Sequence, residues 1–203
     1  MSLLNKVDAL LPQTQCELCT YKGCLPYAQA IVEEDEAIDL CLPGGVRVLR
    51  QLGVLLDRDT ASLESSMKAK QKNDCIVTIK EEECIGCKKC IQACPVDAII
   101  GAAKLMHTVI SDVCNGCELC LSPCPVDCID VEELPPRSNA EQQRLADQSR
   151  HRFDLRNDRL VRQEQLARRK HQQAKNMLVK KSVSARQQAI EEAMQRVKVK
   201  RKG

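Results

Sequence analysis

Aromatic side chains are nearly absent from this chain of 203 residues, which has no tryptophan, one phenylalanine and two tyrosines. Large aromatic rings supply much of the apolar area that offsets chain entropy in a folded core. A core without them needs another source of stability. The 14 cysteines are the residues that could supply it.

Long hydrophobic runs are also absent, since no stretch approaches the roughly 20 apolar residues that cross a bilayer. Met1–Asp8 contain an early acidic residue and no apolar segment of the kind found in signal peptides, so we expect none. We therefore expect a cytoplasmic protein. In that reducing compartment, clustered cysteines indicate metal binding or catalysis rather than disulfides.

Charge is distributed unevenly along the chain. Residues 1–134 carry 12 Lys/Arg and 21 Asp/Glu, a net charge of −9, whereas residues 135–203 carry 19 and 7, a net charge of +12. Every cysteine lies in the acidic part. In the basic part only 12 of 69 residues are Leu, Ile, Val or Phe, too few for a core. We expect a basic, helical or partly disordered tail that begins at the capping box Ser138–Glu141.

A duplicated cysteine motif is the strongest pattern in the acidic part. The motif Cys84-x2-Cys87-x2-Cys90-x3-Cys94-Pro95 returns 30 residues later as Cys114-x2-Cys117-x2-Cys120-x3-Cys124-Pro125. Three thiolates at this spacing let one loop hold three corners of an iron–sulfur cube. In two-cluster ferredoxins the fourth cysteine, before the proline, ligates the other cluster.

The motif therefore predicts two [4Fe–4S] clusters with crossed ligands. We call these ligand sets the second quartet, which is Cys84, Cys87, Cys90 and Cys124, and the third quartet, which is Cys94, Cys114, Cys117 and Cys120. Zinc bound by paired cysteines is the alternative. Two complete runs of this form are not typical of zinc sites.

Four further cysteines form the first quartet, which is Cys16, Cys19, Cys24 and Cys41. The spacing alone leaves a [4Fe–4S] cluster, a zinc ion and an unmetallated site open. Cys75 and Cys128 remain outside the quartets. We interpret them as small buried apolar residues, with ligand exchange or redox sensing as the alternative. For Met106 and His107 we expect packing or surface placement rather than ligation.

The predicted fold class is α+β. Helical periodicity indicates helices over 2–11, 26–34 and 46–56, and short apolar runs indicate strands over 75–79 and 129–134. The predicted domains are a small helical four-cysteine Fe–S module (1–57), a polar linker (58–74), a 2[4Fe–4S] ferredoxin-like domain (75–134) and an extended basic helical tail (135–203).

The cysteine segments resemble a known family. The segments Leu11–Cys16, Cys19–Ala28 and Cys41–Gly45 resemble the first iron–sulfur module of the B subunit of Rnf-type electron transport complexes. The segments Cys84–Ile99 and Met106–Val109 are similar to that subunit's double-cluster domain. The resemblance implies that the first quartet also holds a [4Fe–4S] cluster. It further implies a B subunit that passes electrons within a membrane complex coupling NADH–ferredoxin redox chemistry to ion movement.

Three features depart from that family's pattern. The family usually begins with a membrane-spanning helix, which this sequence lacks. It tends to have glycines where this chain has Glu17 and Thr20, and glycine eases turns that direct amides toward cluster sulfurs. The long basic tail is the third departure.

The sequence therefore predicts an electron carrier with three [4Fe–4S] clusters, and no acid–base constellation for catalysis is present. The alternatives are a free cytosolic polyferredoxin serving another reductase, and a nucleic-acid-binding protein with structural clusters. The tail has one aromatic residue and hence no stacking platforms, which disfavours nucleic acid. The expected partners are redox proteins, including other Rnf-type subunits, and an anionic membrane surface reached through the tail. The latter would place the protein peripherally on the cytoplasmic face of the inner membrane.

Overall fold

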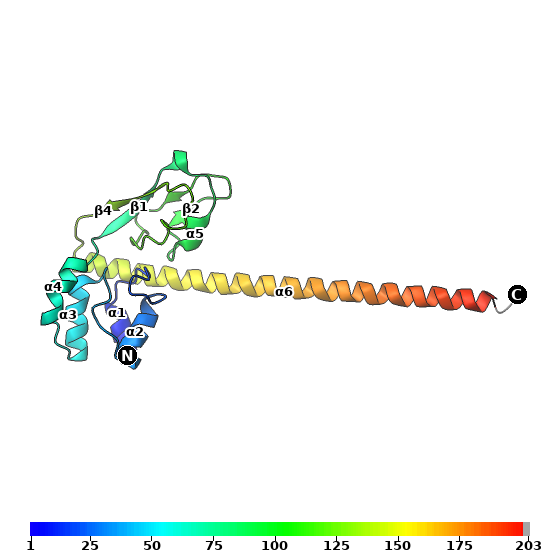
Figure 1. Cartoon of the computed structure of the whole chain (residues 1–203), viewed down its shortest axis with the longest axis horizontal. Coiled ribbons are helices and arrows are strands. Elements are labelled where there is room, and N and C mark those ends of the chain that lie inside the picture. The colour runs from blue at the N-terminus through cyan, green and yellow to red at the C-terminus, as the bar shows by residue number, and fades with distance from the viewer. Residues whose placement is uncertain (201–203) are drawn as a thin grey trace. The chain divides into compact units, whose positions relative to one another are not determined.

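The computed structural model describes residues 1–200. Within the last helix the side chains of Lys181, Ser182, Ala185, Gln195, Arg196, Lys198, Val199 and Lys200 are not described. The chain divides into two compact units, Met1–Arg156 and Asn157–Gly203 (Figure 1).

Four helices build the N-terminal part of the first unit. They are α1 (Leu3–Leu10), α2 (Cys24–Glu33), α3 (Gly45–Leu56) and α4 (Ala61–Lys70). The three helices predicted over 2–11, 26–34 and 46–56 correspond to α1, α2 and α3 and are confirmed. Ser2 caps α1, because its hydroxyl oxygen accepts a hydrogen bond from the backbone N–H of Asn5 at 3.2 Å. The apolar faces of α1–α3 meet in one core that includes Tyr27, Leu49 and Leu52.

Helix α4 lies within residues 58–74, where the sequence predicted a polar linker and no helix. Its apolar signal consists of Leu63 and Met67, one turn apart and therefore on the same face. Met67 is buried in the core formed by α1–α3, and Leu63 packs beside it. Two residues are too few for a period to stand out in a polar segment, which explains why the helix was missed.

Two small antiparallel sheets form the next part of the first unit. Strand β1 (Cys75–Ile79) pairs with β4 (Ile129–Glu133), and β2 (Ile99–Ile100) pairs with β3 (Thr108–Val109). A short 3₁₀ turn η1 (Glu81–Glu83) follows β1, and α5 (Lys89–Ala93) lies against β2 (Figure 1). The two strands expected from the sequence, 75–79 and 129–134, are confirmed as β1 and β4. The mixture of helices and small sheets agrees with an α+β class.

The sequence repeat is also a repeat of backbone conformation. Positions separated by 30 residues share the left-handed region, with φ values of 67° and 70° at Gly86 and Gly116, and of 64° and 61° at Lys88 and Glu118. The two cysteine loops therefore have the same local turns. We call residues 84–90 the first ferredoxin loop and residues 114–120 the second ferredoxin loop.

The last helix, α6, spans Asn139–Lys200 and begins at the predicted capping box. The N–H of Ser138 donates to the Glu141 carboxylate at 2.8 Å, and the N–H of Glu141 donates to the Ser138 hydroxyl at 3.3 Å. Up to Arg156, α6 belongs to the first unit, where its side chains Ala146 and Ser149 are buried.

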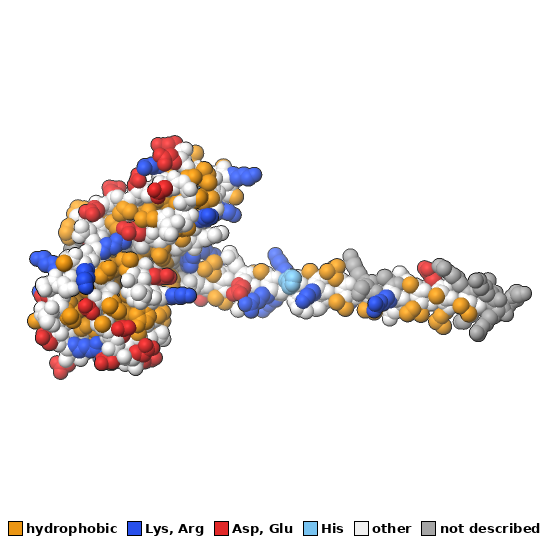
Figure 2. All heavy atoms as spheres, viewed as in Figure 1, with side chains coloured by type: hydrophobic (Ala, Val, Ile, Leu, Met, Phe, Trp, Pro, Cys, Tyr) orange, Lys and Arg blue, Asp and Glu red, His pale blue; other side chains and the backbone are white. Residues whose placement is uncertain are grey.

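The second unit consists of the remainder of α6. After Asn157, which is partly buried, all its described side chains are exposed, and Lys and Arg recur along it (Figure 2). None of the helices in the described part of the chain is both long and apolar enough to cross a bilayer.

Candidate metal centres

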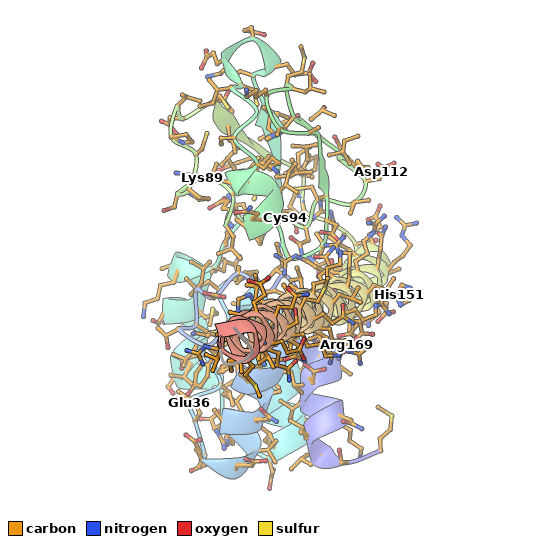
Figure 3. The ribbon with its side chains drawn as sticks, turned by 90° about the vertical axis from the view of Figure 1, so that its right-hand side faces the viewer. Glu36, Lys89, Cys94, Asp112, His151 and Arg169 are labelled. Atoms are coloured by element: carbon orange, nitrogen blue, oxygen red, sulfur yellow. The ribbon has the colours of Figure 1, made fainter. Side chains whose placement is uncertain are left out.

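The third quartet lines one cavity in the first unit. Its members Cys94, Cys114, Cys117 and Cys120 come together with the apolar side chains of Val77, Val96, Ala98 and Ile99, and Asn115 and Glu118 complete the lining. Cys94 lies directly after α5, in the other half of the repeat (Figure 3). The structure therefore brings the fourth cysteine of one motif to the first three cysteines of the other.

The second quartet lines a corresponding cavity. Cys84, Cys87, Cys90 and Cys124 surround it with Ile79, Ile85, His107, Val126, Cys128 and Ile129. Several lining residues of the two cavities are related by the 30-residue repeat, including the pair Val96 and Val126. Cysteine sulfur in an apolar cavity is the donor set that iron–sulfur clusters use. Among the described residues no three His, Cys, Asp or Glu side chains are grouped as a single metal ion requires, and these cysteines surround cavities instead.

Burial controls the acidity of the cavity thiols. It raises the pKa of Cys117 and of Cys120 to about 12, and it also raises the pKa of Cys90 and Cys94. Neighbouring thiolates contribute to these raised pKa values, because each negative charge disfavours the next. Thiols of this kind are protonated at neutral pH in the metal-free protein, so iron binding must displace protons from them.

His107 is a site residue that the sequence reasoning did not assign to a cluster. Its side chain is 1% exposed, its Nδ1 lies 3.2 Å from Cys90 Sγ, and its backbone N–H donates to Cys84 Sγ at 3.3 Å. Gly101 makes room for the ring, since a Cβ there would lie 2.2 Å from His107 Cδ2. The sequence predicted packing or surface placement rather than ligation for Met106 and His107; His107 is packed, and Met106 is exposed. The sequence did contain a signal that could have pointed to a role for His107 near a cluster, because it is the one histidine among residues 1–134.

Cys128 and Cys75 are buried, as expected. Cys128 Sγ lies 3.6 Å from Cys124 Sγ and lines the second quartet's cavity, whereas its repeat counterpart is Ala98. Cys75 Sγ lies 3.5 Å from the Gly116 carbonyl oxygen. Both thiols are therefore neighbours of the quartets, which the sequence did not indicate.

The first quartet consists of Cys24, the first residue of α2, and three cysteines in the loops before and after that helix. Cys24 and Cys41 are buried, while Cys16 and Cys19 are partly exposed. Burial, together with the nearby thiolates of Cys16 and Cys19, raises the pKa of Cys24 to about 12. Burial also raises the pKa of Cys41, to which the other three thiolates contribute.

The loop that carries the first quartet uses left-handed backbone at residues other than glycine. Glu17 has φ 61° and Thr20 has φ 71°. These are the two positions where the resembling family tends to have glycine, so the turns persist without it. Gln15 stabilises the loop from inside, because its side-chain oxygen accepts a hydrogen bond from the N–H of Cys24 at 2.8 Å.

Comparisons with known proteins agree with this geometry. A family model described as "Putative Fe-S cluster" matches residues 11–43, which contain the first quartet. A second, described as "4Fe-4S dicluster domain", matches residues 77–131, which contain the second and third quartets.

Similar proteins identify the family. A protein of Pseudomonas aeruginosa, named as the B subunit of the ion-translocating oxidoreductase complex, is 59% identical over 131 residues, which are 64% of this chain and 68% of the relative. Proteins of the same name are 58% identical over 133 residues in Hahella chejuensis (66% of each chain) and 50% identical over 129 residues in Cronobacter sakazakii (64% and 67%).

The chain belongs to the family of B subunits of ion-translocating oxidoreductase complexes. The predicted resemblance to Rnf-type B subunits is confirmed. The protein is an electron-transfer iron–sulfur protein with ferredoxin-like 4Fe–4S domains.

Proposed function

We propose that the protein carries three [4Fe–4S] clusters, one in each quartet, and exchanges single electrons through them. The observation that carries this proposal is the composition of the two cavities, each lined by four cysteines drawn from both repeats. A zinc site with all four cysteines in one motif would not need a ligand from the other repeat. The clusters would supply outer-sphere, one-electron chemistry, with no substrate bound at iron.

The residues of the chain have three roles in this function. The twelve cysteines of the quartets hold iron as thiolates. Apolar side chains such as Val77 and Val96 exclude water from the cavities. N–H groups donate to ligand sulfurs, for example from Ala98 to Cys94 at 3.2 Å and from His107 to Cys84 at 3.3 Å. With all-cysteine ligation we expect low reduction potentials for the second and third quartets.

Iron and sulfide analysis of anaerobically purified protein tests the cluster count. Three cubane clusters require about 12 iron and about 12 sulfide per chain. A stable preparation with about eight iron and one zinc would remove the first quartet from the proposal.

We also propose that the protein works with other subunits of an ion-translocating oxidoreductase complex. This proposal is supported by its relatives, which are named as B subunits of such a complex. Residues 1–57 and 75–134 would then be its two redox domains, and residues 135–203 an additional segment. Purification under mild detergent from the native host tests this assembly. Recovery of the protein alone, with its clusters intact, would favour a free polyferredoxin that serves another reductase.

The second unit offers a further contact surface. Residues 157–203 hold 14 Lys/Arg and 4 Asp/Glu, and the described side chains after Asn157 are exposed. Because polybasic segments gain roughly 1 kcal/mol per Lys/Arg near an anionic leaflet, we propose reversible attachment of this segment to an anionic membrane surface.

Flotation with vesicles of anionic lipid tests the attachment. The full chain should float at low salt and be released at high salt, since electrostatic attraction is screened. A chain ending at Arg156 keeps the turns of α6 that pack in the first unit and should remain in solution. Equal flotation of both forms would contradict the proposal. Salt-sensitive binding to RNA but not to vesicles would favour the nucleic-acid alternative.

A further inference from the structure

Asn115 is one of the side chains through which the ferredoxin-like part contacts the N-terminal part of the first unit. Its Nδ2 donates a hydrogen bond to the Thr14 carbonyl oxygen at 3.2 Å. Thr14 lies two residues before Cys16 of the first quartet, and Asn115 directly follows Cys114 of the third quartet. A single hydrogen bond therefore connects the loops that carry these two quartets.

A second contact reaches the same ferredoxin loop. Lys72, between α4 and β1, donates from Nζ to the Gly116 carbonyl oxygen at 2.7 Å. The same Nζ lies 3.0 Å from the Glu118 carboxylate. The helical part of the unit is thus attached to the second ferredoxin loop at three neighbouring positions.

The first ferredoxin loop differs at the corresponding positions. The repeat counterpart of Asn115 is Ile85, whose side chain is 57% exposed. Cys87 of the second quartet is exposed as well. In the hydrogen bonds and ion pairs found among the described residues, no partner from residues 1–72 reaches this loop. Two loops with the same backbone therefore have different surroundings.

The first turns of α6 cover the junction at Asn115. Ser149, which is buried, places its hydroxyl 3.5 Å from Asn115 Nδ2. The next residue, Arg150, forms an ion pair with the buried Asp8 of α1 and donates to its carbonyl oxygen at 2.9 Å. Arg152 donates to the carbonyl oxygen of Val96, two residues after Cys94 of the third quartet, at 3.4 Å. The helix thus contacts both parts.

Asp8 also connects α6 to the first quartet through buried side chains. Gln13 Nε2 donates to the Asp8 carboxylate at 3.1 Å, and Gln15 Nε2 donates to Gln13 Oε1 at 2.9 Å. Gln15 in turn accepts the N–H of Cys24. A continuous set of hydrogen bonds therefore runs from Arg150 to a first-quartet cysteine.

The Asn115 side chain makes only part of its possible hydrogen bonds. Its Oδ1 is buried and has no partner within the part of the chain that the structure describes. A buried acceptor without a partner lowers stability, so an apolar residue of similar size would suit burial better. The amide's contribution is its donor group, which connects the two loops.

We propose that Asn115 is the positioning residue that couples the first quartet to the third quartet for electron exchange. The inference rests on the proposed three-cluster function and adds an order to it: first quartet, third quartet, second quartet. One electron leaves a reduced cluster in one quartet and enters an oxidised cluster in the next, with no proton or bond transferred. The second quartet, with its exposed Cys87, is then the end open to an external redox protein.

Asn115→Leu in the full-length, cluster-loaded protein tests this inference. The variant removes the hydrogen bond at nearly constant volume. Ile100→Leu is the control, because it places leucine at an exposed position of the ferredoxin-like part that lines neither quartet's cavity. After flash photoreduction, rapid-freeze EPR measures how fast the electron redistributes between the first-quartet cluster and the ferredoxin-like pair. We expect slower redistribution in Asn115→Leu, an unchanged rate in Ile100→Leu, and unchanged iron content in both.

A second variant, Ser149→Ala, acts on the same junction from α6 and should slow redistribution by a smaller factor. If Asn115→Leu fails to load iron, Ser149→Ala decides the test. Wild-type rates in the loaded variants would overturn the inference while leaving the three-cluster function intact. A wild-type protein without an iron–sulfur cluster in the first quartet would overturn both, and iron and sulfide analysis distinguishes that case.

Discussion

The two parts of the first unit obtain their stability from different residues. The core of α1–α4 consists mainly of aliphatic side chains and one tyrosine, with Leu49, Leu52 and Tyr27 fully buried. Two cysteines of its quartet, Cys16 and Cys19, are partly exposed at the edge of this core. This part has an ordinary hydrophobic core beside its metal site.

In the ferredoxin-like part the cysteines themselves make up much of the core. Its buried set contains five cysteines, Cys90, Cys94, Cys114, Cys120 and Cys128, among small aliphatic residues such as Val96 and Ala98. Because these buried residues are small, we expect the free energy of folding of this part to depend on metal binding more than that of the helical part does.

Removal of iron should produce the largest difference in stability between the two parts. Chelation under anaerobic conditions should unfold β1, β4 and the two ferredoxin loops, because metal binding and folding are coupled there. Helices α1 and α3 should retain their protection against amide hydrogen exchange. Mass spectrometry of exchanged peptides measures both. Equal loss of protection in α3 and β1 would show that the helical part also depends on its metal.

Cys94→Ala should have the second-largest effect, the loss of one cluster from the ferredoxin-like part. If ligands are crossed as predicted, the variant loses the third-quartet cluster and its iron content falls by about four. Cys75→Ala, at a buried cysteine outside the quartets, should keep the full iron content. Loss of the second-quartet EPR signal instead, with the third retained, would show that each motif binds its own cluster.

Leu52→Ala should act on the helical part alone. Truncation of a fully buried leucine costs about 2–5 kcal/mol of stability, and Leu52 has no exposed surface. We expect the first-quartet cluster to become labile to chelators while the other two keep their EPR signals. Val54→Ala, at a highly exposed site on the same helix, is the control. Simultaneous loss of all three clusters would indicate that the two parts unfold together.

His107→Phe should produce a smaller effect within the ferredoxin-like part. Hydrogen bonds to ligand sulfur favour the more negative, reduced state, and loss of a bond worth about 1.4 kcal/mol lowers a one-electron potential by about 60 mV. The potential of the second-quartet cluster should therefore fall, because His107 Nδ1 lies 3.2 Å from Cys90 Sγ. The third-quartet potential serves as the internal control. Redox titration followed by EPR measures both.

The last expected effect concerns how the stability of the metal-free helical part depends on pH. Burial raises the pKa of Cys24 from 9.0 to about 12. The folded state therefore keeps this thiol neutral while the unfolded chain ionises it, so stability is present below pH 9 and is lost as the pH rises toward 12. Thermal unfolding of the apo-protein measured at several alkaline pH values checks the sign. Cys24→Ser should weaken the pH dependence.

Local patterns were sufficient to predict several elements from the sequence. The serine cap and apolar spacing of α1, the faces of α2 and α3, the apolar runs of β1 and β4, and the capping box of α6 all depend on residues near in sequence. The 30-residue cysteine repeat is also a local pattern, because three cysteines at x2 spacing reflect the geometry of one loop around a cluster. That the quartets are ligand sets stays a prediction. Which metal each quartet holds stays a prediction.

Contacts between distant residues were decided by the tertiary structure alone. Nothing near Asn115 in the sequence indicates that it donates to Thr14, since the pair is separated by 101 positions. The burial of His107 against Cys90, the placement of Cys128 beside Cys124 and the packing of Ser149 into the first unit are equally invisible locally. Helix α4 was also decided by the tertiary structure, because its two apolar residues are recognised as a buried face only when they pack against the core of α1–α3. Periodicity and spacing record what a residue's neighbours in the chain require, whereas these contacts depend on how separate elements pack in three dimensions.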